Sequence, residues 1–202
     1  MIGPPPSSIK EWSWPWIEWL NLVYEKLHGP LWEDETATLS GAPSPGVAPA
    51  DLAINGGPYK GKHYSVGDQL QVAFHTTHTI KPGSKYYVHV HWTTNGTATG
   101  TATWRVHLQT AKGYSQEAFP TATTVDIAGT AIAQAWTHYI TEMSDAQAIT
   151  APEVDSLTLC TLELEASSDF GADKVVALYC DIHYQWDRFG TPKRNGPNFY
   201  TR

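Results

Sequence analysis

The chain has 202 residues, a formal net charge of −7, and 16% charged against 12% aromatic side chains. This length suffices for one sizeable domain with its own core, and the acidic balance argues against nucleic acid as a partner because phosphate binding needs a basic surface. No stretch reaches the roughly 18 apolar residues that a membrane span needs, and the N-terminus lacks the pattern of a signal peptide. We therefore expect no membrane contact and synthesis in a cytoplasm.

Residues 1–30 predict a proline-rich arm that contains one short amphipathic helix. The three consecutive prolines Pro4 to Pro6 impose an extended course, whereas Pro15 suits a first helical turn and Gly29-Pro30 ends the helix. Apolar residues recur between these signals at three- and four-residue spacing: Trp16, Trp19, Leu20, Val23 and Leu27. This stripe either packs on its own domain or docks on a neighbouring subunit, and the sequence leaves both alternatives open.

Residues 31–190 predict an all-β domain, an antiparallel β-sandwich of jelly-roll-like type. Residues 40–62 are rich in proline and glycine and indicate a long irregular loop. Alternating patterns then predict strands at about 69–76, 85–93, 102–110, 122–128, 134–142, 156–166 and 174–187, with a further short one at 114–118. The pattern changes phase within Leu157–Leu164, which indicates a bulge or a strand buried on both faces. Residues 191–202 predict an extended tail.

The run Tyr86–Trp92 and the run Trp104–Leu108 both alternate apolar and polar residues at period two. Folding the segment Thr94–Gly100 as a turn pairs the two runs with every apolar residue on one face. The sequence therefore predicts a β-hairpin. In its register, Trp92 opposes Trp104 inward, while His89 opposes His107 and His91 opposes Arg105 outward.

His89 and His91 have a spacing that metal ligands use on a strand, and Gly83 before them matches the opening of the first cupin motif. The carboxylate that this motif needs three or four residues later is missing, because an Asn and a Gly stand there. We therefore expect no metal and no cofactor, and name His89, His91 and His183 as the candidate ligands should a site exist. Otherwise these histidines hydrogen-bond on a partly covered sheet face or meet a neighbouring subunit.

The sequence contains no catalytic motif. A nucleophile elbow, a phosphate-binding glycine loop and an outstanding carboxylate pair are all missing. Cys160 and Cys180 lie in apolar strand patterns without basic neighbours, which favours buried free thiols over a disulfide between neighbouring strands. We expect the protein not to be an enzyme.

Short motifs occur in a fixed order along the chain: Leu31-Trp32-Glu33-Asp34, Lys81-Pro82-Gly83, Val88-His89-Val90-His91-Trp92, a strand with Trp104, and Asp181-Ile182-His183-Tyr184-Gln185 before Gly190. In this order they resemble a family of small structural proteins encoded by tailed bacteriophages, over about residues 31–190. The resemblance implies a β-sandwich component of the virion, assembled in the host bacterial cytoplasm. Of the possible positions in the particle, the resemblance favours a capsid cement or decoration protein, with a neck, tail or fibre-base protein as the second alternative.

Aromatic residues in the arm and the tail would be exposed in a lone monomer, which predicts their burial against partners. The expected contact residues are Trp12, Trp16, Trp19, Leu20, Val23, Leu27, Phe199 and Tyr200. The expected partners are capsid or other virion proteins and further copies of the chain in a dimer or trimer.

Two other classes of function stay open. One is a carbohydrate-binding sandwich, for which the candidate stacking platforms are Trp32, Trp92, Trp104, Trp136 and Trp186. Against it, the alternation places Trp92 and Trp104 on the inward, core-facing side of their strands, where a ligand cannot reach them. The other is a metal-binding cupin-like protein.

Overall fold

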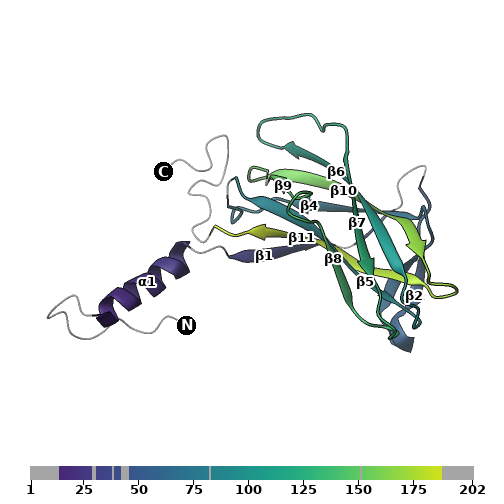
Figure 1. Ribbon diagram of the computed structural model, residues 1–202. Coiled ribbons are helices and arrows are strands. Elements are labelled where there is room, and N and C mark those ends of the chain that lie inside the picture. Colours follow the sequence, from purple (N-terminus) through teal and green to yellow (C-terminus); the bar gives the residue numbers. More distant parts are fainter. Residues whose placement is uncertain are drawn as a thin grey trace.

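The structure is a computed structural model that describes residues 14–28, 31–37, 39–41, 46–81, 83–150 and 152–187. This part of the chain forms an antiparallel β-sandwich with a helix to one side (Figure 1), which confirms the predicted fold class. Its elements are the helix α1 (Trp14–His28), the 3₁₀ turn η1 (Ile54–Gly56) and the strands β1 (Trp32–Ala37), β2 (Ala50–Ala53), β3 (Lys60–Tyr64), β4 (Gln69–His75), β5 (Lys85–Thr94), β6 (Thr101–Lys112), β7 (Thr123–Thr130), β8 (Tyr139–Glu142), β9 (Ile149–Thr150), β10 (Ser156–Ser168) and β11 (Val175–Gln185).

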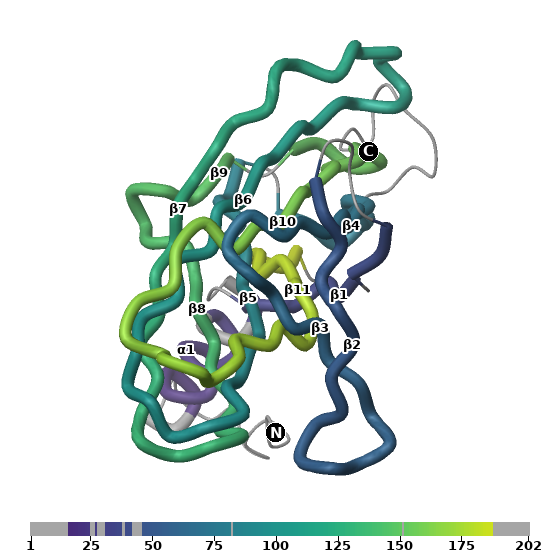
Figure 2. The backbone as a smooth tube through the Cα atoms, turned by 90° about the vertical axis from the view of Figure 1, so that its right-hand side faces the viewer, coloured from purple at the N-terminus to yellow at the C-terminus, as the bar shows by residue number. Residues whose placement is uncertain are grey.

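The strands form two sheets that face each other. The seven-stranded sheet has the order β2-β3-β11-β5-β8, with β1 beside β11 and β9 beside β5, and the four-stranded sheet has the order β4-β10-β6-β7. From β3 onward the chain passes from one sheet to the other at most connections, as in a jelly roll. The loop that joins β6 to β7 reaches beyond the rest of the sandwich in both views (Figures 1 and 2), and residues 114–118 lie in this loop rather than in the predicted strand.

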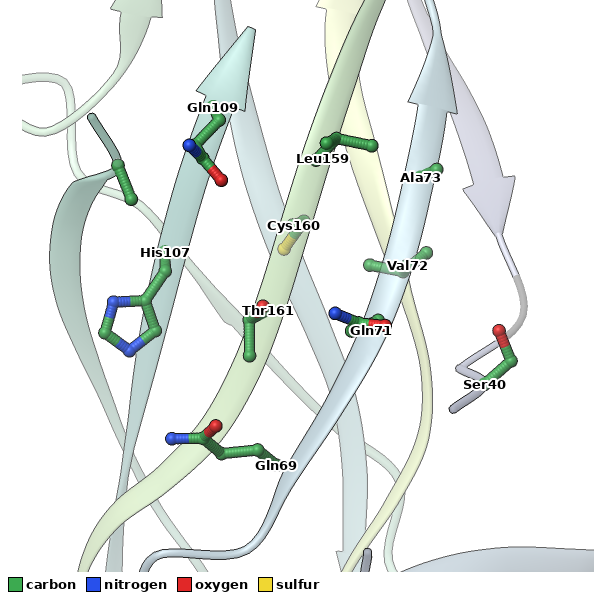
Figure 3. Close-up of a pocket in the computed structure, with 11 residues that line it drawn as sticks. Ser40, Gln69, Gln71, Val72, Ala73, His107, Gln109, Leu159, Cys160 and Thr161 are labelled. Carbon is green, nitrogen blue, oxygen red and sulfur yellow. The ribbon is translucent and has the colours of Figure 1, made fainter. Parts of the chain in front are cut away.

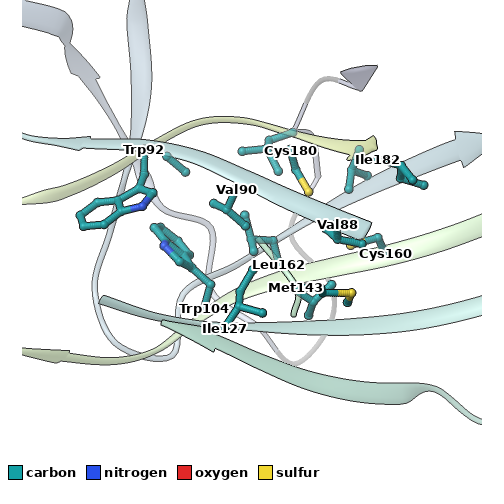
Figure 4. Packing of buried hydrophobic residues seen from close by; sticks show 14 of the residues in the cluster. Val88, Val90, Trp92, Trp104, Ile127, Met143, Cys160, Leu162, Cys180 and Ile182 are labelled. Atoms are coloured by element: carbon teal, nitrogen blue, oxygen red, sulfur yellow. The ribbon is translucent and has the colours of Figure 1, made fainter. Parts of the chain in front are cut away.

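The predicted hairpin between β5 and β6 is wrong, because these strands belong to different sheets. β5 pairs with β11, β8 and β9, whereas β6 pairs with β10 and β7. The prediction that both tryptophans point inward is nevertheless correct. Trp92 and Trp104 are fully buried and meet edge to face across the core, with ring centroids 6.3 Å apart (Figure 4). Alternation decides which side chains point inward but does not name the neighbouring strand.

The core lies between the two sheets and is rich in aromatic rings. Tyr64 packs edge-on against Trp104, with ring centroids 5.2 Å apart. The indole Nε1 of Trp92 donates a hydrogen bond to Thr141 Oγ1 at 2.8 Å. Gly129 on β7 allows this approach, because a Cβ there would collide with Thr141. The two thiols, Cys160 and Cys180, are free and buried, as predicted.

Other sequence predictions need smaller corrections. The predicted loop at 40–62 contains β2 and the start of β3, and the predicted strand at 134–142 shortens to β8. In β10 the buried positions alternate without a break from Ser156 to Leu164, and the irregularity falls between Leu164 and Ala166. Thr158 is therefore an inward residue, and its hydroxyl is bonded to Thr110 Oγ1 at 2.8 Å. Thr158 masks the alternation in the sequence because a hydrogen-bonded hydroxyl occupies a core position.

Helix α1 has the predicted extent and carries apolar side chains on more than the predicted stripe. Trp16 packs edge-on against Trp19 with ring centroids 5.7 Å apart, and Val23 is partly buried. The exposed apolar side chains are Ile17, Leu20, Leu22, Tyr24 and Leu27. No helix in the described part of the chain has the length and apolar character to span a membrane. Trp12, Phe199 and Tyr200 lie outside the described residues.

Candidate functional site

The outer face of the seven-stranded sheet, turned away from the core, carries what we call the histidine cluster. Strand β5 places His89 and His91 on this face, and β11 places Asp181 directly opposite His89. Side chains that alternate on adjacent strands gather on one face, so four strands contribute to a single site. The cluster consists of Asp34, His89, His91, His138, Glu142, Asp181 and His183.

The centre of the histidine cluster is buried although it lies outside the core. His89, His91 and Asp181 are only 8%, 6% and 3% exposed. The Asp181 carboxylate lies between the two imidazoles, with Oδ1 3.6 Å from His89 Nδ1 and Oδ2 3.2 Å from His91 Nε2. The ring of Tyr179 stacks on His91 at 4.1 Å and helps to cover the centre. Among the described residues, His91 Nε2 and Asp181 Oδ1 make no hydrogen bond.

The remaining ring nitrogens of the two central histidines have partners on the strand β8 side. His89 Nε2 lies 2.6 Å from Glu142 Oε1, and His91 Nδ1 lies 2.8 Å from His138 Nε2. Desolvation lowers the pKa of His138, and the neighbouring His91 lowers it further, which favours the neutral form of His138. Each central imidazole is thus held at its outer nitrogen and presents its inner nitrogen to Asp181.

His183 extends the histidine cluster toward a groove at the sheet surface. Its Nδ1 lies 3.7 Å from Glu142 Oε1, and its Nε2 lies 3.9 Å from Asp34 Oδ1. The adjoining groove has a volume of about 400 Å³ and is lined by Trp32, Tyr87, Glu142, Met143, Ser144, Asp145 and His183. The hydroxyl of Tyr87 donates to Asp145 Oδ1 at 2.8 Å, and this bond raises the pKa of Tyr87.

The sequence named three of these residues and missed four. His89, His91 and His183 lie together, with the His89 and His183 rings 4.9 Å apart, but His107 lies on the other sheet. Asp34, His138, Glu142 and Asp181 were missed because they come from other strands or from a loop. The one available signal was the alternation of Asp181 with His183, which places both on the same face of one strand.

The outer face of the four-stranded sheet carries a second, broader groove of about 650 Å³ (Figure 3). Its side chains come from β4, β6 and β10, with Ser40 at the margin. Two of its polar side chains already bond to neighbours: Gln69 Nε2 donates to Glu163 Oε2 at 2.7 Å, and His107 contacts both Thr124 and Glu163. The rest of the lining consists mainly of amides and apolar side chains, and its imidazole is already paired with Glu163 at 3.2 Å.

The other candidate residues from the sequence fall in different places. Trp92 and Trp104 are buried in the core and cannot stack on a ligand, whereas Trp32 is 44% exposed beside the groove at the histidine cluster. A hydrogen bond with Cys160, together with burial, raises the pKa of the Cys180 thiol, which opposes nucleophilic chemistry there.

No model of a known protein family matches the chain, and no curated protein matches it. Among solved structures, an isomalto-dextranase of Arthrobacter globiformis T6 is 13% identical, with 75% of this chain and 23% of that chain covered and a TM-score of 0.40. A Clostridium thermocellum xylanase fragment with CBM22-1 and GH10 modules is also 13% identical, covering 83% and 27%, with a TM-score of 0.34.

A carbohydrate-binding module specific for non-crystalline cellulose, CBM28, is 11% identical, covering 75% of this chain and 97% of that one, with a TM-score of 0.33. The chain spans about a quarter of the length of the first two structures. At these identities and scores the likeness is one of fold alone, and no function follows from it.

Proposed function

We propose that the chain is a non-enzymatic structural subunit of a tailed-bacteriophage virion, most specifically a capsid cement or decoration protein. The virion setting comes from the resemblance of the ordered motifs, among them Val88–Trp92 and Asp181–Gln185. In this proposal helix α1 attaches the sandwich to a groove on a neighbouring virion subunit, including further copies of this chain. The observation that carries the proposal is the exposed apolar surface of α1.

Helix α1 exposes large apolar side chains that a free helix would present to water. Leu22 is 51% exposed and Leu27 is 44% exposed, and Ile17 and Leu20 are exposed as well. A helix of 15 residues is marginal in water on its own, and most of its stability in proteins comes from packing an apolar face. Docking of such a face in a groove is a recurring mode of recognition between proteins.

The sandwich does not use the helix to complete its core. The buried hydrophobic cluster of the described residues begins at Leu39 and runs to Tyr184, with no member from α1. Figure 1 shows α1 beside the sandwich rather than across either sheet. The helix is therefore available for attachment, and burying each of its large apolar side chains would contribute about 1.5–3 kcal/mol before the ordering costs of association.

A truncated chain that starts at Leu31 tests the proposal. We expect it to fold with a cooperative melt, because the core lies beyond that point, and to bind particles assembled without the protein at least about tenfold more weakly. Co-sedimentation with such particles measures the binding, and the copy number per particle separates a capsid position from a neck, tail or fibre-base position.

A matched pair of charge variants sharpens this test in the full chain. Leu20→Glu and Asn21→Glu each add one negative charge at an exposed position of α1, but only Leu20 belongs to the apolar stripe. We expect the first variant to lose particle binding and the second to retain it. A truncated chain that unfolds, or equal binding by both variants, would show that the helix is not an attachment arm.

Sugar binding is a second candidate function, favoured by one observation. Trp32 is exposed beside the groove that also holds Tyr87, Glu142, Asp145 and His183, so an aromatic face and polar groups converge there. A glycan array followed by titration of Trp32→Ala decides this point. Specific binding that depends on Trp32 would support glycan recognition, and its absence on the array would leave the attachment role alone.

A further inference from the structure

Three potential metal-ligand atoms converge at the centre of the histidine cluster. One ring nitrogen each of His89 and His91 and one Asp181 carboxylate oxygen all lie within 4.8 Å of one another. Tetrahedral zinc holds its nitrogen and oxygen ligands at 2.0–2.2 Å, which places neighbouring ligand atoms roughly 3.4 Å apart. The separations of 3.6 Å from His89 Nδ1 to Asp181 Oδ1 and 3.2 Å from His91 Nε2 to Asp181 Oδ2 lie close to this spacing, so each imidazole faces one oxygen of the carboxylate.

The outer partners of the two imidazoles orient their inner nitrogens for binding a cation. When His89 Nε2 donates to Glu142 from the neutral ring, Nδ1 carries the lone pair. When His91 Nδ1 donates to His138 Nε2, the lone pair of His91 Nε2 likewise faces Asp181. Such partners behind ligating histidines are the usual supports of metal sites.

Two lone pairs and a carboxylate that face one another in a buried place repel each other unless a positive charge lies between them. His91 Nε2 and Asp181 Oδ1 accordingly make no hydrogen bond in the described structure, although both residues are more than nine-tenths buried. Buried polar atoms without a partner are uncommon and call for a ligand, an ion or water. This second observation, independent of the residue types, points to an ion at the same place.

We propose that His89, His91 and Asp181 bind one divalent transition-metal cation, with zinc as the best match. Two imidazole nitrogens and one carboxylate suit zinc and its neighbours, whereas calcium and magnesium prefer sites made of oxygen. The cation would link β5 to β11 on the outer face of the sheet. This site goes beyond the virion role, which does not require a metal, and it reverses the expectation from the sequence that the histidines bind none.

The neighbouring group of Asp34, His89 and His183 is a weaker candidate for the ion. Its Asp34 side chain is 53% exposed and lies 3.9 Å from His183 Nε2. The His89 Nε2 atom on that side is already engaged by Glu142 at 2.6 Å. The buried group with Asp181 therefore has both the better-defined spacing and the free lone pairs.

The test is titration of the full-length protein with ZnCl₂ after a chelator has removed bound metal. We expect one Zn²⁺ per chain by calorimetry, a rise in melting temperature on binding, and the strong visible absorption of four-coordinate Co²⁺ when cobalt replaces zinc. MgCl₂ should produce none of these changes. Asp181→Asn and His91→Gln should each weaken Zn²⁺ binding about a hundredfold or more.

A matched control comes from the other sheet, where His107 Nε2 lies 3.2 Å from Glu163 Oε2. The double variant His107→Gln with Glu163→Gln should bind Zn²⁺ as the wild type does. Should Asp181→Asn fail to fold, Glu142→Gln replaces it. That partly exposed carboxylate supports His89 from behind and is not one of the three proposed ligands, so its loss should weaken binding about ten- to a hundredfold.

Four results would overturn the proposal. The first is that the protein binds neither Zn²⁺ nor Co²⁺, and the second is that the His91 and Asp181 variants bind Zn²⁺ fully. The third is that the His107 and Glu163 control loses Zn²⁺ binding, and the fourth is that Zn²⁺ binding is lost only when Asp34 and His183 are changed. Stabilisation of the metal-free protein by acid without any zinc binding would assign the charge between the imidazoles to protons, and would equally contradict the proposal.

Discussion

The outer faces of the two sheets both carry histidines and carboxylates, yet they differ in almost every physical respect. On the seven-stranded sheet, His89, His91 and Asp181 are nearly inaccessible, and part of their hydrogen-bonding capacity is unused. On the four-stranded sheet, His107 is more exposed and both of its ring nitrogens contact partners, Thr124 Oγ1 at 3.0 Å and Glu163 Oε2 at 3.2 Å.

The difference shows how little the residue types alone say about a site. Charges at an exposed sheet surface interact weakly because water screens them, whereas charges removed from water need a partner of opposite sign. Both β5 and β6 are flanked by strands on either side, but Tyr179 covers His91 on β5, whereas the outer face of β6 lies at an open groove. The same alternation thus produces a buried site whose charges need a partner on one sheet, and an ordinary polar surface on the other.

The largest effect should come from the core that both sheets share. Trp104→Ala is expected to cost about 3–5 kcal/mol of unfolding free energy, because it removes a fully buried indole that packs on Trp92 and Tyr64. Denaturant unfolding followed by circular dichroism measures the loss. The control is His107→Ala on the outward side of the same strand, which should cost far less; equal losses would break the assignment of inner and outer faces.

A middle-sized effect should come from the single hydrogen bond that holds the Trp92 indole. Thr141→Val keeps the side-chain shape but leaves the buried Trp92 Nε1 proton without its acceptor, at an expected cost of about 1–3 kcal/mol. Thr141→Ser retains an acceptor oxygen and should cost less than the valine variant in the same unfolding experiment. A valine variant as stable as the wild type would show that this bond contributes no net stability.

The smallest effect should come from the charges on the four-stranded sheet. Arg105 donates to both Asp126 carboxylate oxygens at 2.8 Å and 2.9 Å and also pairs with Glu165. Since these groups are solvent-exposed, Arg105→Ala should lower the melting temperature by only about 1–2 °C, and less at high salt.

The pH dependence of the Arg105 effect follows from Asp126. The hydrogen bond from Arg105, aided by its charge, lowers the pKa of the Asp126 carboxyl below its usual value. A lowered carboxyl pKa stabilises the folded state above the unfolded pKa of about 3.9, and this stabilisation is lost as the pH falls through the folded pKa. The difference between wild type and Arg105→Ala should therefore be present at neutral pH and shrink in acid. A difference that grew in acid would contradict the ion pair.

Local patterns in the sequence determined the helix, the two buried thiols and the inward residues of β5 and β6. They did so because helix-ending signals and the two-residue period of a strand act over a few neighbouring residues. The errors of this local interpretation have local causes as well. Thr158 points inward with a hydrogen-bonded hydroxyl, and the short strands β2 and β3 lie in a glycine- and proline-rich segment that predicts a loop.

Only the tertiary structure decided which strands are neighbours. The sequence pairs β5 with β6 because they are adjacent in the chain, but the segment between them crosses to the other sheet and β5 pairs with β11 instead. That pairing brings Asp181 to His89 and supplies the carboxylate that the motif around His91 lacks. The inward or outward direction of a side chain is a property of each strand, whereas strand pairing depends on how the whole core closes. The sequence could therefore name His89, His91 and His183 but not the carboxylates that meet them.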